Sequence, residues 1–230
     1  MTPETLMAVM EATWPPVASW VLGPWRLRDG AGGGKRVSAA TVAGPWQPAD
    51  IALAEAAMPQ PLFMIRPQDS DLDAALAARG YDVVDPVVGY AVDTGGFDPA
   101  PPMATFPHWP PLRIAADLWD DAGIGAARLA VMNRAEGPKT VILARTADRA
   151  VGVAFVALHG TTAMLHALEV SPHHRRQGTA RHILAAAAVW SRGQGAQTLA
   201  LVVTVANTAA RALYASQGMQ AVGQYHYRQK

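Results

Sequence analysis

The sequence predicts a mixed α/β fold, built on a sheet with parallel and antiparallel strands. First, three apolar runs follow one another with only short turn-forming segments between them, as consecutive antiparallel strands do. Second, helical and strand-like patterns then alternate twice. The expected strands are residues 140–145, 150–158, 162–170, 198–204 and 219–227, and the expected helices 117–133 (one helix or two), 178–192 and 207–217. The resulting order is α, β, β, β, α, β, α, β.

The composition is that of a globular protein. Half of the 230 residues are apolar, and 19 basic residues nearly balance 18 acidic ones. A net charge of +1 gives no sign of a nucleic-acid partner, which usually requires a strongly basic domain or stripe. Cysteine is absent, which excludes disulfides, thiolate metal sites and a cysteine acyl-enzyme.

No stretch predicts a membrane span. The most apolar runs, Ile183–Trp190 and Leu199–Ala206, are about eight residues long, whereas a spanning helix needs roughly 20. The N-terminus contains Glu4 and Glu11 and lacks the pattern of a signal peptide. We therefore expect a cytoplasmic protein without a membrane partner.

A proline-rich stretch divides the chain. Residues 97–112 contain six prolines in sixteen positions, so neither a helix nor a central strand is expected there. We interpret it as a linker or an extended crossing segment. The expected domains are 1–96, of α+β type, and 113–230, with the linker between them.

A phosphate-binding loop is predicted after the strand that ends at Val170. Pro172 stops the strand, a polar turn follows, and a helix begins near Gly178. Small residues at Gly178 and Ala180 allow a ligand to approach the backbone. The unpaired amides and partial positive charge of a helix N-terminus suit a pyrophosphate.

With the downstream segment, this loop resembles the GNAT N-acetyltransferase superfamily. Arg175-x-x-Gly178-x-Ala180 is similar to the acetyl-CoA loop of that family. Val170-x-Pro172 is similar to the residues that lead into this loop in the family. The second signature is similar to the string that runs from Asn207 through Ala210, Leu213, Tyr214 and Gly218 to Met219, where the family more often has Phe last. The resemblance covers about residues 140–227.

The resemblance implies acetyl-CoA as cofactor and a set of residues that hold it. The amides of the loop would bind the pyrophosphate, the end of the third strand would pair with the pantetheine amides, and Asn207 would bond the pantetheine arm. The implied cofactor residues are Leu168, Val170, Arg175, Arg176, Gln177, Gly178, Thr179, Ala180 and Asn207. His173, His174 and Arg181 flank the loop, either near the nucleotide 3′-phosphate or on a solvated surface.

Tyr214 is the candidate general acid. The family resemblance places it near the sulfur, where it would protonate the departing thiolate. Its position, seven residues after Asn207, is two helical turns away and thus on the same face. The alternative is a half-buried aromatic residue that only packs.

The general base is left open between His166, Glu169 and a water relay. An alkylammonium with a pKa near 10.4 must lose a proton before attack, which costs roughly 4.6 kcal/mol at pH 7. The string from His166 to Val170 resembles arylalkylamine N-acetyltransferases, in which a histidine at this place relays protons, whereas the alternative is a strand histidine bonded to a neighbouring backbone. Glu169 could instead attract the substrate ammonium. In a regular strand, residues three apart point to opposite faces, so His166 and Glu169 should be separated.

Two other patterns are set aside. Gly30-Ala-Gly-Gly-Gly-Lys35-Arg36 has three residues between its outer glycines and no Ser or Thr after the lysine, so it does not match a P-loop. The seven histidines have no zinc or iron spacing, and we expect no metal.

The N-terminal part resembles, more weakly, a segment that precedes some bacterial GNAT domains and is a degenerate copy of the same fold. The similar positions are Trp25-x-Leu27-Arg28, Arg36–Ala39 and Leu72…Leu76…Gly80-Tyr81. Two tandem GNAT-like domains are therefore expected, the first supplying one wall of an acceptor pocket. The tryptophans are expected in cores or between domains, although two or three of those at 14, 20, 25 and 46 could line the pocket.

These observations predict acetyl-CoA-dependent N-acetylation of a primary amine, with a small molecule favoured over a protein. The alternatives are a protein lysine or N-terminal acetyltransferase, an O-acyl or longer-acyl transferase, and a lapsed module that only binds acyl-CoA. The sequence leaves a homodimer open.

Overall fold

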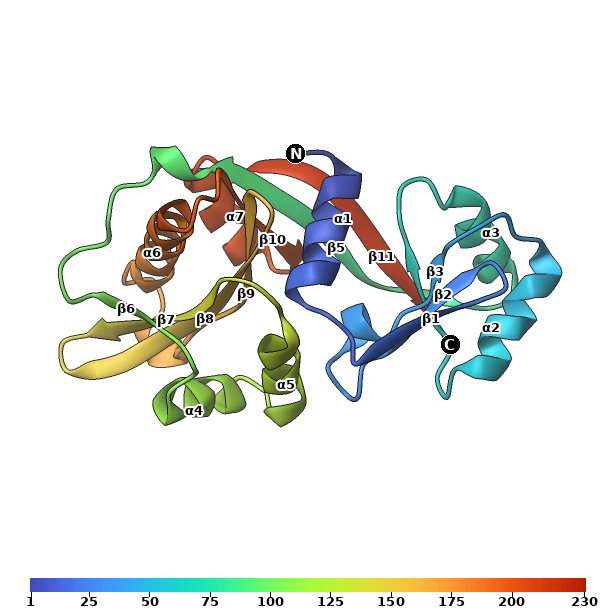
Figure 1. Ribbon diagram of the computed structural model, residues 1–230, viewed down its shortest axis with the longest axis horizontal. Helices are drawn as coiled ribbons and strands as arrows, with labels where there is room; N and C mark the ends of the chain where they lie inside the picture. The colour runs from blue at the N-terminus through green and yellow to red at the C-terminus, as the bar shows by residue number, and fades with distance from the viewer.

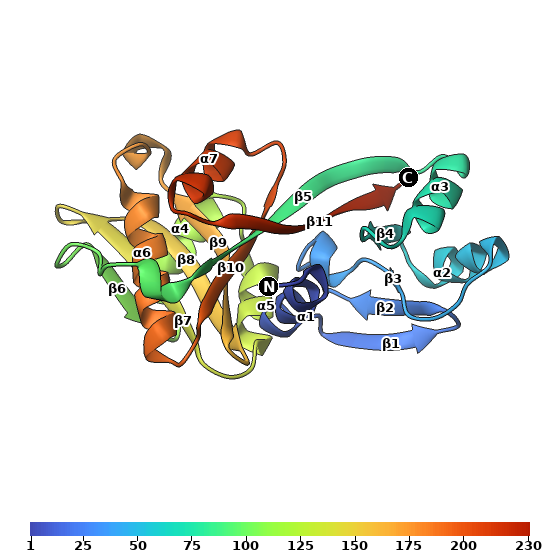
Figure 2. The same cartoon turned by 90° about the horizontal axis from the view of Figure 1, so that it is seen from above.

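The computed structural model describes residues 1–230 and shows two lobes joined by long strands (Figures 1 and 2). The helices are α1 (Pro3–Thr13), α2 (Ile51–Ala57), α3 (Ser70–Ala78), α4 (Arg113–Asp121), α5 (Ala126–Arg134), α6 (Thr179–Gly193) and α7 (Thr208–Ser216). The strands are β1 (Ala18–Leu22), β2 (Trp25–Asp29), β3 (Thr41–Val42), β4 (Leu62–Ile65), β5 (Asp82–Asp93), β6 (Thr105–His108), β7 (Lys139–Thr146), β8 (Arg149–His159), β9 (Thr162–Val170), β10 (Thr198–Thr204) and β11 (Gln220–Gln229). None of the helices combines the length and apolar character needed to cross a bilayer.

The largest sheet of the molecule has eight strands in the order β4-β11-β5-β10-β9-β8-β7-β6. Its pairs are antiparallel except β9 and β10, which run parallel. One core, with Ile183, Leu184 and Ala187 of α6, covers one face of β7–β10. A second core, with Trp119 of α4 and Val131 of α5, covers the other face. The mixed α/β fold is confirmed, including its order of helices and strands after residue 113.

The two halves repeat one order of elements. The N-terminal half runs α1, β1, β2, β3, α2, β4, α3, β5, and the C-terminal half has the same order when α4 and α5 count as one helical segment and the edge strand β6 is left aside. A parallel bridge joins Ala40, next to β3, to Phe63 of β4, as β9 joins β10. This repetition agrees with a tandem arrangement of two GNAT-like units.

The last strand of each half is exchanged with the other half. Strand β5 pairs with β10, whereas β11 pairs with β4, and β5 and β11 pair with each other. The order β4-β11-β5-β10 is thus symmetric about its centre, and both long strands run from one lobe to the other (Figure 2). The expected boundary at residue 96 therefore does not separate two sheets, because β5 lies within the sheet of the C-terminal lobe.

The proline-rich segment is extended, as expected, and contributes the edge strand β6, which pairs with β7. Because an edge strand has one unpaired side, it tolerates Pro107, which has no amide proton to donate.

Helix α1 packs between the two lobes (Figure 1) and buries Leu6, Val9 and Met10. It packs against β5 so closely that a Cβ atom on Gly89 would stand 2.2 Å from Leu6 Cδ2. Glycine is required there for the helix to reach the sheet. The end of α1 is thereby placed beside β9, where the candidate site begins.

Candidate active site

The two parallel strands at the centre of the sheet separate at one end. Backbone pairing between β9 and β10 runs from Thr162 and Thr198 only to Leu165 and Leu201. Beyond these residues, β9 stays paired with β8 as far as Val170, while β10 stays paired with β5 as far as Thr204. A wedge therefore opens between the strands, and the expected separation of the third strand from its neighbour is present.

A bulge in β9 determines which residues face this wedge. His166 lies opposite Phe155 and Glu169 opposite Val153, so Ala167 and Leu168 together face one residue of β8. Ala167 has a φ of +50°, which absorbs the extra residue. Since Val153 and Phe155 share one face of β8, His166 and Glu169 also share a face. The expectation that they lie on opposite faces is wrong, because it assumed a regular strand.

The bulge is fixed by a contact from the second core. The indole Nε1 of Trp119 in α4 donates to the carbonyl oxygen of Ala167 at 2.8 Å. Trp119 itself is completely buried. The bulge is therefore held in place by a hydrogen bond from a core side chain.

The loop before α6 presents six consecutive backbone amides, from Arg176 to Arg181, that donate to no acceptor in the protein. The last three belong to the first turn of α6, where no earlier carbonyl is available. The first regular bond of this helix is from His182 to the carbonyl of Gly178. Such a row of amides, with the positive end of a 15-residue helix behind it, is a site for an anion such as a pyrophosphate.

Local contacts shape this loop. Arg176 and Gly178 have φ values of +63° and +86°, and the left-handed conformation turns successive amides toward one side. The Arg175 Nε donates to the carbonyl of Val170, and the Gln177 side chain donates to the carbonyl of His173. Arg175 and Gln177 thus hold the loop through their side chains, while the exposed amides face outward. The buried Thr179 anchors the start of the helix.

The free edge of β9 supplies further amides. Ser171 donates to the carbonyl of Val151, so the amides of odd-numbered residues here point to β8. By alternation, Leu168 and Val170 direct their amides into the wedge toward β10. This orientation fits the pairing with pantetheine amides that the sequence predicts for these two residues.

Tyr214 of α7 is 6% exposed and packs against the ring of Tyr90 on β5, with 5.9 Å between ring centres. Burial, and secondly the negative charge of Glu169, raise the pKa of Tyr214 to about 12. The structure therefore brings Tyr214 and Glu169 together, and the phenol holds its proton at neutral pH. A protonated phenol is the form that a general acid needs.

Glu169 is half buried on β9. Burial raises the pKa of its carboxyl group above the usual value, although the positive charges of Arg175 and Arg128 oppose this effect. A carboxylate with a raised pKa is a stronger base than a fully solvated one.

Asn207 is the residue that caps α7. Its Oδ1 accepts a hydrogen bond from the amide of Ala210 at 3.1 Å, and the side chain is exposed. The helix begins at Thr208, one residue later than expected. The Nδ2 group makes no bond within the protein, so it is available as a donor to a ligand.

His166 is buried and bonded at both ring nitrogens. Thr13 donates its hydroxyl proton to the carbonyl of Val9 at 2.7 Å, so its oxygen accepts from His166 Nε2, 2.9 Å away. The Nδ1 atom then accepts from Arg36 Nη1 at 3.0 Å. Burial and, secondly, the charge of Arg36 lower the pKa of His166 well below its usual value. The ring is thus neutral, with no lone pair left for a substrate proton.

A pocket of about 310 Å³ lies on this side of the wedge, between the loop before β3 and strands β9 and β10. Its walls include Trp14 and His166, the end of β10, and the side chains of Lys35, Arg36, Asp85 and Arg128. The N-terminal half thus contributes to the wall of a pocket, but Trp14 is the one tryptophan in the lining, fewer than the two or three considered from the sequence.

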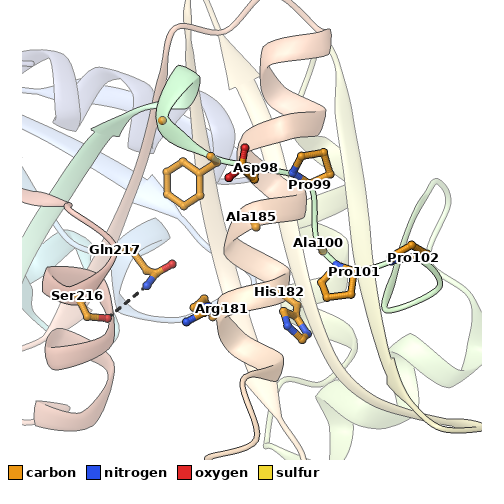
Figure 3. A pocket seen from close by; sticks show the side chains of 12 residues that line it. Asp98, Pro99, Ala100, Pro101, Pro102, Arg181, His182, Ala185, Ser216 and Gln217 are labelled. Atoms are coloured by element: carbon orange, nitrogen blue, oxygen red, sulfur yellow. Dashed lines mark hydrogen bonds between the residues drawn. The ribbon is translucent and has the colours of Figure 1, made fainter.

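A larger pocket of about 750 Å³ lies beside α6 (Figure 3). Its lining combines Arg181 and His182 of α6, the segment from Gly96 to Pro102, and the end of α7 at Ser216 and Gln217. In Figure 3, Arg181 lies between α6 and Gln217, while His182 lies toward Pro101. Of the residues that flank the loop, Arg181 therefore faces a cavity, whereas His173 is exposed.

Sequence reasoning missed the residues around His166, namely Thr13, Arg36 and Arg128. Thr13 and Arg36 lie 153 and 130 residues from His166 in the sequence. The only local signal was the glycine-rich string before Lys35 and Arg36. That string packs against α5, where a Cβ atom on Gly33 would stand 2.5 Å from Val131. Its glycines thus allow a close approach of two segments.

Three comparisons with known proteins bear on this site. The family model described as acetyltransferase (GNAT) family matches residues 90–219, which is 130 of the 230 residues. This range contains the bulged strand, the loop of unpaired amides and Tyr214. The comparison with curated proteins gives no match.

Several solved structures share the fold. A GCN5-related N-acetyltransferase from Kribbella flavida has a TM-score of 0.72 at 17% identity, over 99% of this chain and 95% of that one. A conserved protein of unknown function from Staphylococcus epidermidis has a TM-score of 0.68 at 13% identity, over 91% and 92%. A tandem GNAT protein from the clavulanic acid biosynthesis pathway has a TM-score of 0.57 at 16% identity, over 94% and 84%.

At these identities the structural matches establish the fold, and the family model independently covers more than half of the chain. The chain belongs to the GNAT family of acetyltransferases.

Proposed function

We propose that this acetyltransferase uses acetyl-CoA to acetylate a primary amine on a small molecule, by direct transfer. The observation that supports it most is the row of unpaired amides from Arg176 to Arg181 beside the open edge of β9. These groups suit the pyrophosphate and the amide-containing arm of coenzyme A, respectively. When bound, acetyl-CoA supplies an activated acyl group as a thioester.

The residues of the chain then have separate tasks. The amides of the loop hold the pyrophosphate, assisted by the fixed side chains of Arg175 and Gln177, and Asn207 Nδ2 bonds the pantetheine arm. Glu169 Oε, directly or through a water molecule, takes the proton from the substrate ammonium. The amide of Leu168 or Val170 would stabilise negative charge on the acyl oxygen. Tyr214 Oη would give its proton to the sulfur and would regain one from the nitrogen that has joined the acyl group.

His166 has a different part in this proposal from the one expected. Because its nitrogens bond Thr13 and Arg36, we assign it to positioning these two residues. Glu169 is left as the side chain for proton removal. Its raised pKa and its electrostatic coupling to Tyr214 support this assignment.

The experiment combines binding and turnover on the intact protein. Coenzyme A at 100 times its Kd should add about 2.7 kcal/mol to the free energy of unfolding, seen as a rise in Tm. Release of free thiol from acetyl-CoA is then measured with panels of amines, alcohols and lysine peptides. No change in Tm with coenzyme A contradicts the proposal. A rise in Tm without transfer to any acceptor identifies a binding module, and transfer to peptides alone identifies a protein acetyltransferase.

A further inference from the structure

The pocket beside His166 has more positive charge than its own carboxylate neutralises. Three cations line it, Lys35, Arg36 and Arg128, against one carboxylate, Asp85. Asp85 is already paired with Lys35 at 2.8 Å. Neither arginine forms an ion pair with a carboxylate of the protein, although the charge of Arg128 opposes the rise in the pKa of Glu169.

Arg36 is held in place without being neutralised. Its Nη1 donates to the neutral ring of His166, and its guanidinium lies 5.7 Å from the centre of the Trp14 ring. Its Nε is buried and has no hydrogen-bond partner. The Nη2 group also makes no bond within the protein, and it is not buried. An arginine N–H without an acceptor is costly, so an acceptor on a ligand at the accessible Nη2 group would be favoured, and a carboxylate would also offset the charge.

The carboxylate that shares a second cavity with Arg36 is bound by a different arginine. Glu11 lines the small cavity on the other side of Arg36. Both of its oxygens, however, accept from Arg28, at 3.3 Å from Nε and 3.1 Å from Nη2. Arg28 also bonds the carbonyl of Ala39, which fixes it there. Glu11 therefore does not occupy the guanidinium of Arg36, which stays available to a ligand.

The pocket reaches the place where transfer would occur. Its lining includes His166 and Ala167 of β9 together with Val202, Val203 and Thr204 of β10, which are the residues beyond the last β9–β10 pair. Arg128 lines the same pocket beside the glycine-rich string, since its Nε would stand 3.6 Å from a Cβ atom on Gly34. An acceptor in this pocket would have its amine at the wedge and its other end at the arginines.

We infer that the acceptor is a small amine that also carries a carboxylate, with Arg36 binding that carboxylate and Arg128 adding to the attraction. The inference rests on the proposed function for the identity of the amine as acceptor. A guanidinium fork matches a carboxylate with two parallel hydrogen bonds. The volume of about 310 Å³ suits a molecule of amino-acid size.

The test compares each standard α-amino acid with its α-carboxamide, in which the same amine lacks the anionic group. Calorimetry on the intact protein, with and without coenzyme A, measures binding, and thiol release from acetyl-CoA measures transfer. We expect at least one carboxylate to bind about tenfold or more tightly than its carboxamide. Arg36→Gln should bring this ratio close to one. Arg36→Lys, which keeps the charge but not the fork, should restore part of it.

Arg149→Gln is the matched control. Arg149 is exposed at the start of β8, outside the pocket, so the ratio should stay as in the wild type. The inference is overturned if no amino acid binds better than its carboxamide, or if the preference survives in Arg36→Gln. Calorimetry tests the inference, and thiol release tests the proposed function. Thiol release without a binding preference for the carboxylate therefore refutes only the inference. A carboxylate preference without thiol release refutes only the proposed function.

Discussion

His166 on β9 donates a hydrogen bond to Thr13 at the end of α1, with 2.9 Å between Nε2 and Oγ1. This contact joins a strand of the acetyltransferase core to a helix that lies 153 residues earlier in the chain. Trp14 packs against the same imidazole with its ring tilted by 32°, and the ring centres are 5.0 Å apart. The neutral ring is thus part of the interface between the lobes.

The stability of the protein should fall as the pH decreases below about 6.5. The pKa of His166 is lowered in the folded state, so the unfolded chain binds the proton first. The free energy of unfolding then decreases toward acid by at most about 1.4 kcal/mol per pH unit from this group. Urea denaturation at pH 7.5 and 5.5 measures it. His166→Gln should reduce the pH dependence of the free energy of unfolding. His159→Gln, which replaces an exposed histidine, should leave this pH dependence unchanged. Equal slopes in all three proteins would contradict the assignment.

Tyr214→Phe should lower kcat by about 10² to 10⁴ and leave the affinity for coenzyme A nearly unchanged. The ring keeps its packing against Tyr90, and only the proton donor is lost. Thiol-release kinetics and calorimetry measure the two effects. Tyr81→Phe serves as the control, because the hydroxyl of Tyr81 bonds Glu55 within the N-terminal lobe. An unchanged kcat in Tyr214→Phe would exclude the phenol as the general acid.

Glu169→Gln should lower kcat/KM. It should also remove the rise of kcat/KM with pH on the acid side of the pH profile. In the wild type, kcat/KM should rise with pH as the carboxyl group of Glu169 loses its proton, at a pH above the usual range for glutamate because its pKa is raised. The variant cannot accept a proton and should show no such rise. The pH profile of thiol release checks this. A variant that retains the wild-type rise would assign the base to another group.

Gly178→Ala should weaken the binding of coenzyme A about tenfold or more, because the new Cβ stands beside the unpaired amides. It should also cost about 1–2 kcal/mol of stability, since φ is +86° at this position. Gly195→Ala is the matched control. Gly195 has φ of +89°, at the far end of α6, with nothing within 4 Å of an added Cβ. Thermal unfolding should show a similar loss in both variants, and calorimetry a loss of affinity in Gly178→Ala alone.

The loop before α6 could be predicted from the sequence because its structure is determined locally. Pro172 ends the strand, Gly178 takes the left-handed conformation, and the helix begins next to it, all within a few residues. The helices and strands after residue 113 follow from local periodicity in the same way.

The surroundings of His166 and Glu169 could not be predicted, because they depend on contacts that no local pattern encodes. The bulge at Ala167 arises from pairing with β8 and from the bond to Trp119, and it reverses the expected faces of His166 and Glu169. The placement of β5 between β10 and β11 depends on partners more than 100 residues away, since Thr198 pairs with Asp93. The proline-rich stretch, which marks a break in composition, is not a break in the sheet.

The exchange of β5 and β11 also determines the order in which strands of the main sheet are able to pair during translation. Strand β4 has only β11 as its neighbour in the main sheet, and Gln220 follows Ile65 by 155 residues. During synthesis, β4 therefore lacks its partner in the main sheet until nearly all of the second lobe has been translated. A nascent chain will expose the edge of β4 throughout that interval, which makes this edge a place where a chaperone would act.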